Sequence, residues 1–163
     1  MLPAAPDPLG PLVAALAGRG LRIGVAESLT AGALAARLAA VPGVSAVLRG
    51  GVVAYASDLK IALLDVDGDL LAAGGPVQAE VAAQMARGAA RVLGAEIGLA
   101  TTGVAGPGPA DGNPAGTFHV ACAGPAGVRT RSWLVAGTRP AVRAAAVDAA
   151  LALLADVVAE VEP

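Results

Sequence analysis

Hydrophobic positions along the chain fall into two patterns. Some form unbroken runs of about six residues, as in strands buried on both faces of a sheet, and others recur every three or four residues, as on one side of a helix. Mostly apolar runs predict strands at 21–26, 46–55, 97–102 and 117–123, with a candidate bulge at 50–51, and the turn residues at 124–127 predict a hairpin that adds a strand at 128–135. The spaced stretches predict helices at 8–19, 30–40, 57–64, 76–93 and 138–161.

Local signals refine these helices. Ser57 and Thr138 stand at helix starts, where a hydroxyl can accept a hydrogen bond from a free backbone N–H, so both are expected to be N-caps. Residues 65–75 are polar and contain glycine, which predicts a loop with room for one helical turn. The buried side of the helix over 76–93 is expected to carry four residues spaced by four, four and three positions: Val81, Met85, Ala89 and Val92.

Strands that alternate with helices and end in a hairpin predict an α/β protein. We expect three layers (α/β/α) around a mixed, mostly parallel sheet of about five strands, one of them reversed. Residues 1–163 contain no visible linker or repeat, so they should form a single domain, with the proline-rich residues 1–10 flexible. Ligands of such sheets bind beyond the carboxyl ends of the strands. Three polar stretches fall at such ends: AESLTAG (26–32), YASDLK (55–60) and TTGVAGPG (101–108).

Composition removes several classes of function. The formal net charge of −2 argues against a nucleic-acid partner, which needs clustered positive charge. Charged residues interrupt every apolar stretch before about 20 residues accumulate, and no signal peptide is visible, so neither a membrane span nor export is predicted and a cytoplasmic protein is expected. The lone Cys122 and the lone His119 lie in one apolar run and are expected to be structural. This leaves no disulfide, no metal-ligand cluster and no Ser-His-Asp triad.

Two residues stand out because the chain contains each type once. Lys60 is the only lysine among 11 basic residues, and Tyr55 is the only tyrosine. A desolvated lysine can act as a base at neutral pH, whereas arginine cannot. Ser28 and Thr30 precede a helix, where they either cap it or place Ser28 as a nucleophile beside N–H groups that hold an oxyanion. A solvated lysine and an edge tyrosine are the alternatives.

A glycine-rich loop and two arginines are candidates for binding an anion. Gly103 and Gly106 let the backbone approach a ligand, and Thr102 can donate to it, although the loop matches neither GxGxxG nor the P-loop pattern. Arg139 and Arg143 lie four residues apart on one helix face, where they either point into solvent or clamp a phosphate or carboxylate.

Several motifs together resemble those of the CinA C-terminal domain family. They are AESLTAG, VPGVS, RGGVVAYASDLK, PVQAEVAAQMARGA, TTGVAGPG, NPAGTFHVA and TRPAVRAAAVDAAL, in the family's order and spacing over about residues 10–155. The resemblance implies a stand-alone form without the N-terminal domain of full-length CinA proteins. It also implies the family's usual activity, which is the deamidation of nicotinamide mononucleotide (NMN) to nicotinic acid mononucleotide and ammonia, with no metal and no cofactor.

The same resemblance implies roles for particular residues. Ser28, Lys60 and Tyr55 fall on the catalytic positions, with Tyr55 hydrogen-bonded in the same cluster. The residues expected to bind substrate are Glu27, Thr30, Gly32, Thr102, Gly103, Gly106, Arg139 and Arg143, of which Arg143 is the stronger phosphate candidate. The chain departs from the family pattern at Leu29, which replaces a small residue or cysteine, at Ala31, which replaces glycine, and at Gln78, which replaces serine.

The mechanism expected from these assignments is acyl transfer. Ser28 attacks the carboxamide and Lys60 takes its proton, or Lys60 activates water directly while Ser28 only binds. The rival hypothesis is a non-catalytic module that binds a nucleotide or phosphate, and an accessory role in DNA uptake has little physical support. The expected partners are a small-molecule nucleotide and a second copy of the chain, since a homodimer or larger homo-oligomer is common for small α/β enzymes.

Overall fold

A computed structural model describes residues 7–161, and its centre is one five-stranded sheet in the order β2-β1-β3-β4-β5. The strands are β1 (Ile23–Glu27), β2 (Leu48–Val53), β3 (Ile97–Gly103), β4 (Thr117–Gly124) and β5 (Gly127–Leu134). β1 is parallel to both β2 and β3, whereas β4 is antiparallel to β3 and to β5. The sheet is therefore mostly parallel with β4 reversed, which confirms the fold predicted from the sequence.

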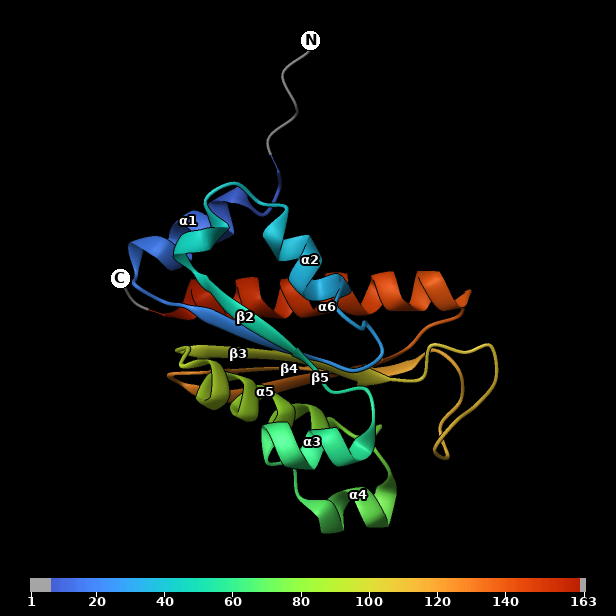
Figure 1. The fold of residues 1–163 in the computed structure, drawn as a ribbon. Coiled ribbons are helices and arrows are strands. Elements are labelled where there is room, and N and C mark those ends of the chain that lie inside the picture. The colour runs from blue at the N-terminus through green and yellow to red at the C-terminus, as the bar shows by residue number, and fades with distance from the viewer. Residues whose placement is uncertain (1–6, 162–163) are drawn as a thin grey trace.

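Helices cover both faces of this sheet (Figure 1). On one face lie α1 (Gly10–Gly18), α2 (Ala33–Ala39) and α6 (Arg139–Glu160), and on the other lie α3 (Ser57–Leu64), α4 (Gly68–Gly74) and α5 (Ala79–Leu93). A short 3₁₀ helix, Val44–Ala46, precedes β2. Two hydrophobic clusters fill the spaces between the layers, one around Leu16, Leu34 and Leu154 and one around Met85 and Ala89. Three layers with a core on each side of the sheet are the predicted architecture.

The close packing of α5 on the sheet depends on glycine. A Cβ on Gly98 of β3 would overlap the backbone of Ala86 in α5, and a Cβ on Gly24 of β1 would overlap Leu93. These two strands end at the site described below, so the close packing of α5 holds in position the strands that carry the site. The bulge expected in β2 is present, because the pairing with β1 skips Arg49 next to Gly50.

Four local predictions differ from the structure. Ser57 does not cap α3, since Ala56 occupies the N-cap position and Ser57 is the first residue inside the helix. Val92 is 46% exposed, whereas Val81, Met85 and Ala89 are buried as expected. Residues 65–75, expected to be a loop with room for one helical turn, contain the two-turn helix α4, which is capped by the carboxylate of Asp67. The helix expected from residue 30 begins only at Ala33, for a reason that concerns the site.

Other predictions are confirmed. Thr138 caps α6 by accepting a hydrogen bond from the Ala141 N–H. Cys122 is fully buried, which raises the pKa of its thiol to about 12. His119 lies on β4 and pairs with Ser132 across the hairpin. Residues 1–6 of the start expected to be flexible lie outside the described range, while Asp7 forms a double hydrogen bond with Arg37.

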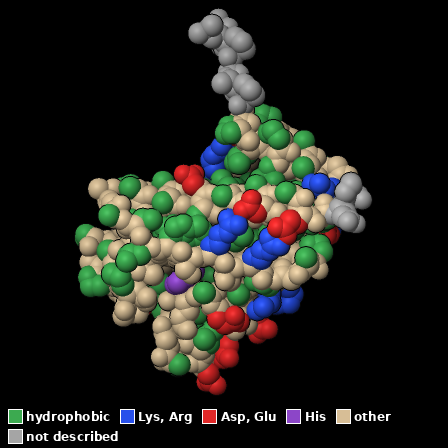
Figure 2. All heavy atoms as spheres, turned by 180° about the vertical axis from the view of Figure 1, so that it is seen from behind, with side chains coloured by type: hydrophobic (Ala, Val, Ile, Leu, Met, Phe, Trp, Pro, Cys, Tyr) green, Lys and Arg blue, Asp and Glu red, His purple; other side chains and the backbone are tan. Residues whose placement is uncertain are grey.

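The apolar character of the helices and the distribution of surface charge bear on membrane and nucleic-acid binding. Over residues 7–161, none of the helices combines the length and the apolar character that crossing a membrane requires. On the face seen from behind, basic and acidic side chains lie next to each other rather than gathering in one basic patch (Figure 2). Arg129 and Arg131 of β5, for example, form ion pairs with Glu160 and Asp156 of α6.

Candidate functional site

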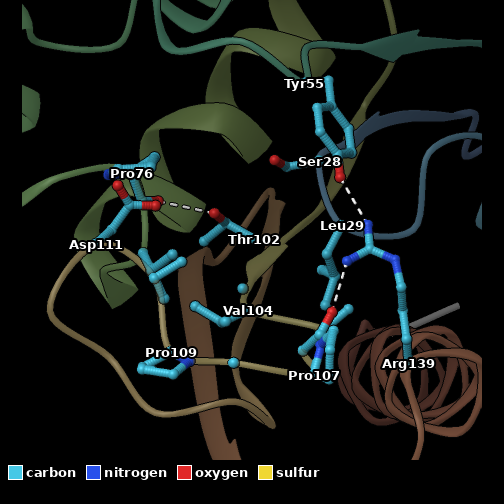
Figure 3. Close-up of a pocket in the computed structure, with 16 residues that line it drawn as sticks. Ser28, Leu29, Tyr55, Pro76, Thr102, Val104, Pro107, Pro109, Asp111 and Arg139 are labelled. Carbon is cyan, nitrogen blue, oxygen red and sulfur yellow. Dashed lines mark hydrogen bonds between the residues drawn. The ribbon is translucent and has the colours of Figure 1, made fainter.

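A pocket of about 290 Å³ lies beyond the carboxyl ends of β1 and β3 (Figure 3). Its size is near the lower end of the range for small-molecule sites. The three polar stretches found in the sequence all contribute to its wall, through Ser28, Tyr55 and Thr102. The pocket is completed by the loop 103–111 and by Arg139 at the start of α6. The expectation of a site at this edge of the sheet is therefore met by an actual cavity.

Ser28 and Lys60 are in direct contact beside this pocket. Ser28 follows the last residue of β1. Lys60 belongs to α3, which follows the parallel strand β2 and therefore begins at the same edge of the sheet. The Lys60 Nζ lies 3.1 Å from the Ser28 Oγ, 2.8 Å from the Ala54 carbonyl oxygen and 3.1 Å from the Tyr55 carbonyl oxygen. The pair joins a hydroxyl that lines the pocket to an amine that has no exposed surface.

Burial changes the acid–base chemistry of Lys60. Its side chain is fully buried, and desolvation lowers the pKa of the amine from 10.5 to about 8, although the negative charge of Asp111 acts in the opposite direction. The protonated amine donates one hydrogen bond to each of its three neighbours. A neutral amine has only two N–H bonds, which the two carbonyl oxygens require because they can only accept. Its lone pair then faces the hydroxyl proton of Ser28.

Glu27 explains why the predicted helix starts late. Its carboxylate is 1% exposed and accepts hydrogen bonds from the N–H groups of Gly32, Leu34 and Ala35 at 3.0, 3.0 and 2.8 Å. A carboxylate is a favourable partner for the N-terminus of a helix. The N–H groups at the start of α2, expected from the sequence to hold an oxyanion, are therefore already used by Glu27. The expectation is therefore wrong for the N–H groups of Gly32, Leu34 and Ala35.

The turn between β1 and α2 offers other donors. Among residues 7–161, no acceptor is found for the backbone N–H of Leu29 or of Thr30. The carbonyl groups of the same two residues accept hydrogen bonds from the Arg143 guanidinium at 2.9 and 2.8 Å. Arg143 thus holds the turn in place from α6, and the Thr30 hydroxyl anchors it to Thr101 at 2.7 Å.

Four residues expected to bind substrate are absent from the pocket wall. They are Glu27, Thr30, Gly32 and Arg143, and the contacts described above give each of them a structural role in the turn. Substrate contact by these residues stays a prediction. Two departures from the family pattern lie in the same turn: Leu29 is 3% exposed and forms part of the pocket wall, and Ala31 adopts a left-handed conformation with a φ of 49°.

Tyr55 and Arg139 line the pocket on the same side as Leu29, opposite Asp111 (Figure 3). The Tyr55 hydroxyl accepts a hydrogen bond from Arg139 at 2.9 Å, and Arg139 also donates to the Gly106 carbonyl oxygen at 2.9 Å (Figure 3). Only the backbone carbonyl of Tyr55 contacts Lys60. The prediction that the phenol joins the serine–lysine cluster is therefore wrong, and Arg139, the weaker of the two arginine candidates, is the one that lines the pocket.

The remaining predicted residues lie on the pocket wall. Thr102 is almost fully buried and donates its hydroxyl hydrogen to the Pro76 carbonyl oxygen at 2.7 Å, which ties β3 to the segment before α5. Gly103 and Gly106 line the pocket as expected. A Cβ on Gly103 would collide with the backbone of Phe118 in β4, so glycine there serves the sheet pairing as well as the pocket.

Asp111 is the charged residue of this wall that sequence reasoning missed. A signal was present in the letters ADGN, because Asp-Gly is a preferred pair for a two-residue hairpin turn. Asp111 and Gly112 have φ angles of 51° and 74°, and Ala110 and Asn113 exchange two backbone hydrogen bonds on either side of them. The glycine-rich loop therefore ends in a defined turn that presents a carboxylate to the pocket.

Comparison with known proteins places the chain in a family. Residues 10–158 match the family model described as the CinA C-terminal domain. The chain belongs to this family. A CinA-like protein of Frankia casuarinae is 50% identical over 145 residues, which are 89% of this chain and 34% of the relative. Another, from Anaeromyxobacter dehalogenans strain 2CP-1, is 49% identical over 144 residues, which are 88% of this chain and 35% of the relative.

Solved structures of the family have the same fold. A CinA superfamily protein from Escherichia coli superposes with a TM-score of 0.87 at 35% identity, covering 91% of this chain and 87% of the other. The competence damage-inducible protein A of Klebsiella pneumoniae gives a TM-score of 0.87 at 35% identity over 96% of this chain and all of the other. The CinA chain described here spans about a third of the length of the curated relatives it matches.

Proposed function

We propose that this CinA domain is an amidohydrolase that converts nicotinamide mononucleotide to nicotinic acid mononucleotide and ammonia. The observation that carries the proposal is the contact between Ser28 and the buried Lys60, at 3.1 Å, beside a pocket at the sheet edge. A lysine that is partly neutral near physiological pH and bonded to a serine is the arrangement of an activated nucleophile. With a pKa of about 8, roughly a tenth of Lys60 is neutral at pH 7.

The first half of the reaction forms an ester on the protein. The Ser28 oxygen attacks the carboxamide carbon while its proton moves to the lone pair of Lys60, which the two carbonyl contacts aim at the hydroxyl. The resulting tetrahedral intermediate breaks its C–N bond. The leaving nitrogen takes the proton from Lys60 and departs as ammonia, which leaves an acyl ester on Ser28 and a neutral Lys60.

The second half consumes one water molecule. Lys60 takes a proton from the water as its oxygen attacks the ester, and returns that proton to Ser28 as the C–O bond to the serine breaks. The carboxylic acid formed in place of the carboxamide loses its proton to the released ammonia, which leaves a carboxylate and ammonium at neutral pH. The oxyanion formed in both halves is assigned to the Leu29 and Thr30 N–H groups, because the N–H of the residue after a nucleophile serves this purpose in other enzymes.

The nucleotide phosphate is assigned to Arg139. Its guanidinium gives one hydrogen bond each to Tyr55 and Gly106 and keeps further N–H donors for an anion. Arg143 then acts as a positioning residue, because it holds the carbonyl groups of the oxyanion turn from behind. Leu29, which departs from the family pattern, lines the pocket with its side chain, and this leaves the backbone N–H groups of Leu29 and Thr30 as donors.

The test is ammonia release from NMN by the wild-type protein, Ser28→Ala, Lys60→Met and Lys60→Arg. The three variants should each lose about a thousandfold or more of the turnover, since a base and a nucleophile that act together fail together. Lys60→Arg is the informative control, because it retains a cation that cannot accept a proton. Retention of most turnover by Ser28→Ala would replace the ester by direct attack of water.

Failure of the proposal has a separate signature. A folded wild-type protein that releases no ammonia, while NMN raises its melting temperature, would be the non-catalytic nucleotide-binding module considered from the sequence. The Arg139→Gln variant should then lose the thermal shift, because the guanidinium would be the main anchor for the phosphate.

A further inference from the structure

The pocket carries opposite charges on its two sides. Figure 3 shows Asp111 and Arg139 on opposite sides of the pocket, with Ser28 and Thr102 between them. Over residues 7–161, neither side chain takes part in an ion pair: Arg139 donates to a hydroxyl and a carbonyl oxygen, and Asp111 has no basic side chain within salt-bridge distance. Both charges are therefore available to a ligand that is positive at one part and negative at another.

The position of Asp111 is set by several contacts. Ala110 and Asn113 exchange backbone hydrogen bonds at 3.0 and 2.9 Å, and the Asn113 side chain donates to the Asp111 carbonyl oxygen at 2.9 Å. Asp111 also packs against Gly75 at the end of α4, where an added Cβ would lie 3.3 Å from the Asp111 Cβ. The turn is thus pinned both within the loop and against a helix end, which places the carboxylate at one wall.

Asp111 also acts on the reacting end of the pocket. Its negative charge opposes the desolvation of Lys60 and raises the pKa of the amine relative to burial alone. An interaction of this kind requires that the carboxylate and the amine share one electrostatic environment. The carboxylate therefore lies within electrostatic reach of the place where the carboxamide carbon must sit for attack by Ser28.

We propose that Asp111 selects substrates whose ring is positively charged, by flanking the ring while Arg139 holds the phosphate. This inference rests on the proposed function and assigns Asp111 as a specificity-determining residue for that substrate, which is an N-glycosylated pyridinium carboxamide and a phosphate monoester. The ring nitrogen of such a nucleotide is bonded to the ribose, so the ring carries a positive charge. Reduction of the ring to the dihydropyridine removes the charge and retains the carboxamide, the ribose and the phosphate.

The experiment compares binding of NMN and of its reduced form, which differ mainly in ring charge. The dissociation constants are measured by calorimetry in a Ser28→Ala background, so that neither ligand is consumed. The second protein carries Ser28→Ala and Asp111→Asn, and Asn-Gly is as favourable as Asp-Gly in a two-residue hairpin turn. The control carries Ser28→Ala and Asp69→Asn, which removes an equal charge from an exposed position on α4 away from the pocket wall.

The Ser28→Ala protein should bind NMN about five- to tenfold more tightly than the reduced form, because the pair of charges is partly open to water. Asp111→Asn should bring this ratio to about one by weakening NMN alone, and Asp69→Asn should leave the ratio unchanged. Equal weakening of both ligands by Asp111→Asn would show that the carboxylate only shapes the loop. An unchanged ratio would overturn the inference as well.

Ammonia release by the wild-type protein separates this inference from the proposed function. Release of ammonia together with a ratio insensitive to Asp111→Asn would retain the amidohydrolase and reject the role of Asp111. A ratio that depends on Asp111 in a protein that releases no ammonia would retain the charge selection and reject the amidohydrolase.

Discussion

Replacement of Lys60 by methionine tests the burial of the amine through folding alone. Methionine has a similar length and no charge, and the site it would occupy is fully buried. The pKa of Lys60 falls from 10.5 in the unfolded chain to about 8 in the folded protein because burial disfavours the charged form. Each pKa unit corresponds to 1.36 kcal/mol, so the difference of about 2.5 units costs the protonated folded state about 3 kcal/mol.

The direction of the pH dependence follows from where the proton binds more tightly. The unfolded chain binds it more tightly than the folded protein, so protonation favours unfolding. Well above pH 10.5 both states are neutral and this cost is absent. As the pH falls from about 10.5 to about 8, the unfolded state takes up the proton first and the free energy of unfolding decreases. Below about pH 8 both states are protonated and the cost stays constant.

Urea unfolding of the wild type and Lys60→Met at pH 7 and at about pH 9.5 measures this effect. The wild type should gain about 2 kcal/mol relative to the variant over this interval, or roughly 4–8 °C in melting temperature. The hydrogen bonds that methionine cannot make to Ala54 and Tyr55 contribute about equally at both pH values and cancel from the comparison. A parallel response of the two proteins, within about 0.5 kcal/mol, would mean that Lys60 titrates normally and would remove the physical basis for its role as a base.

Three further predictions concern the turn and the loop around the pocket. Glu27→Gln should lower the free energy of unfolding by about 2–4 kcal/mol in urea titration, because an amide cannot accept hydrogen bonds from all three N–H groups of α2 and adds an N–H donor of its own. A loss below about 0.5 kcal/mol would contradict the observed cap. Ala31→Gly should raise the melting temperature by about 2–4 °C in a thermal scan, since alanine pays about 1 kcal/mol for its left-handed conformation; a lower melting temperature would refute this. Asp111→Asn should shift the rise of kcat with pH to lower pH, because the carboxylate raises the pKa of Lys60; a shift to higher pH in a pH–rate profile would reverse the assigned sign.

The sheet and the edge that carries the site were predictable from the sequence. Mostly apolar runs locate the first four strands and the turn at 124–127 locates the fifth. The carboxyl ends of parallel strands meet at one edge, so AESLTAG and TTGVAGPG had to lie close together. Lys60 and Tyr55 are each the only residue of their type in the chain; Tyr55 lines the pocket, and Lys60 lies beside it, hydrogen-bonded to Ser28. The contact between Ser28 and Lys60, 32 residues apart, followed only from the family resemblance, because spacing along the chain does not determine how α3 is oriented relative to the end of β1.

The errors around the site have a common physical cause. Sequence patterns indicate where a backbone donor or a polar side chain lies but not which partner it takes. Glu27 takes the N–H groups of α2, Arg143 takes the carbonyl groups of the turn, and the Tyr55 hydroxyl takes Arg139 instead of Lys60. The contacts of Arg143 and Tyr55 join segments that are distant in sequence, and the contact of Glu27 depends on how the turn after β1 folds back. Hydrogen-bond partners of this kind are decided by tertiary packing.

The cap formed by Glu27 has a consequence for how the site can work. A carboxylate at the start of α2 satisfies three helix N–H groups and places a negative charge directly after β1, next to Ser28 in the chain. An oxyanion forming at those N–H groups would have to displace it, which is unfavourable for two negative charges in a buried place. In the proposed mechanism the donors for the oxyanion would therefore come from the turn itself, and Arg143 holds the carbonyl groups of Leu29 and Thr30 on its own side of that turn. Glu27 and Arg143 fix the turn from both ends beside Ser28, the proposed nucleophile, and the buried amine of Lys60 is the only proton acceptor in contact with Ser28 among the described side chains.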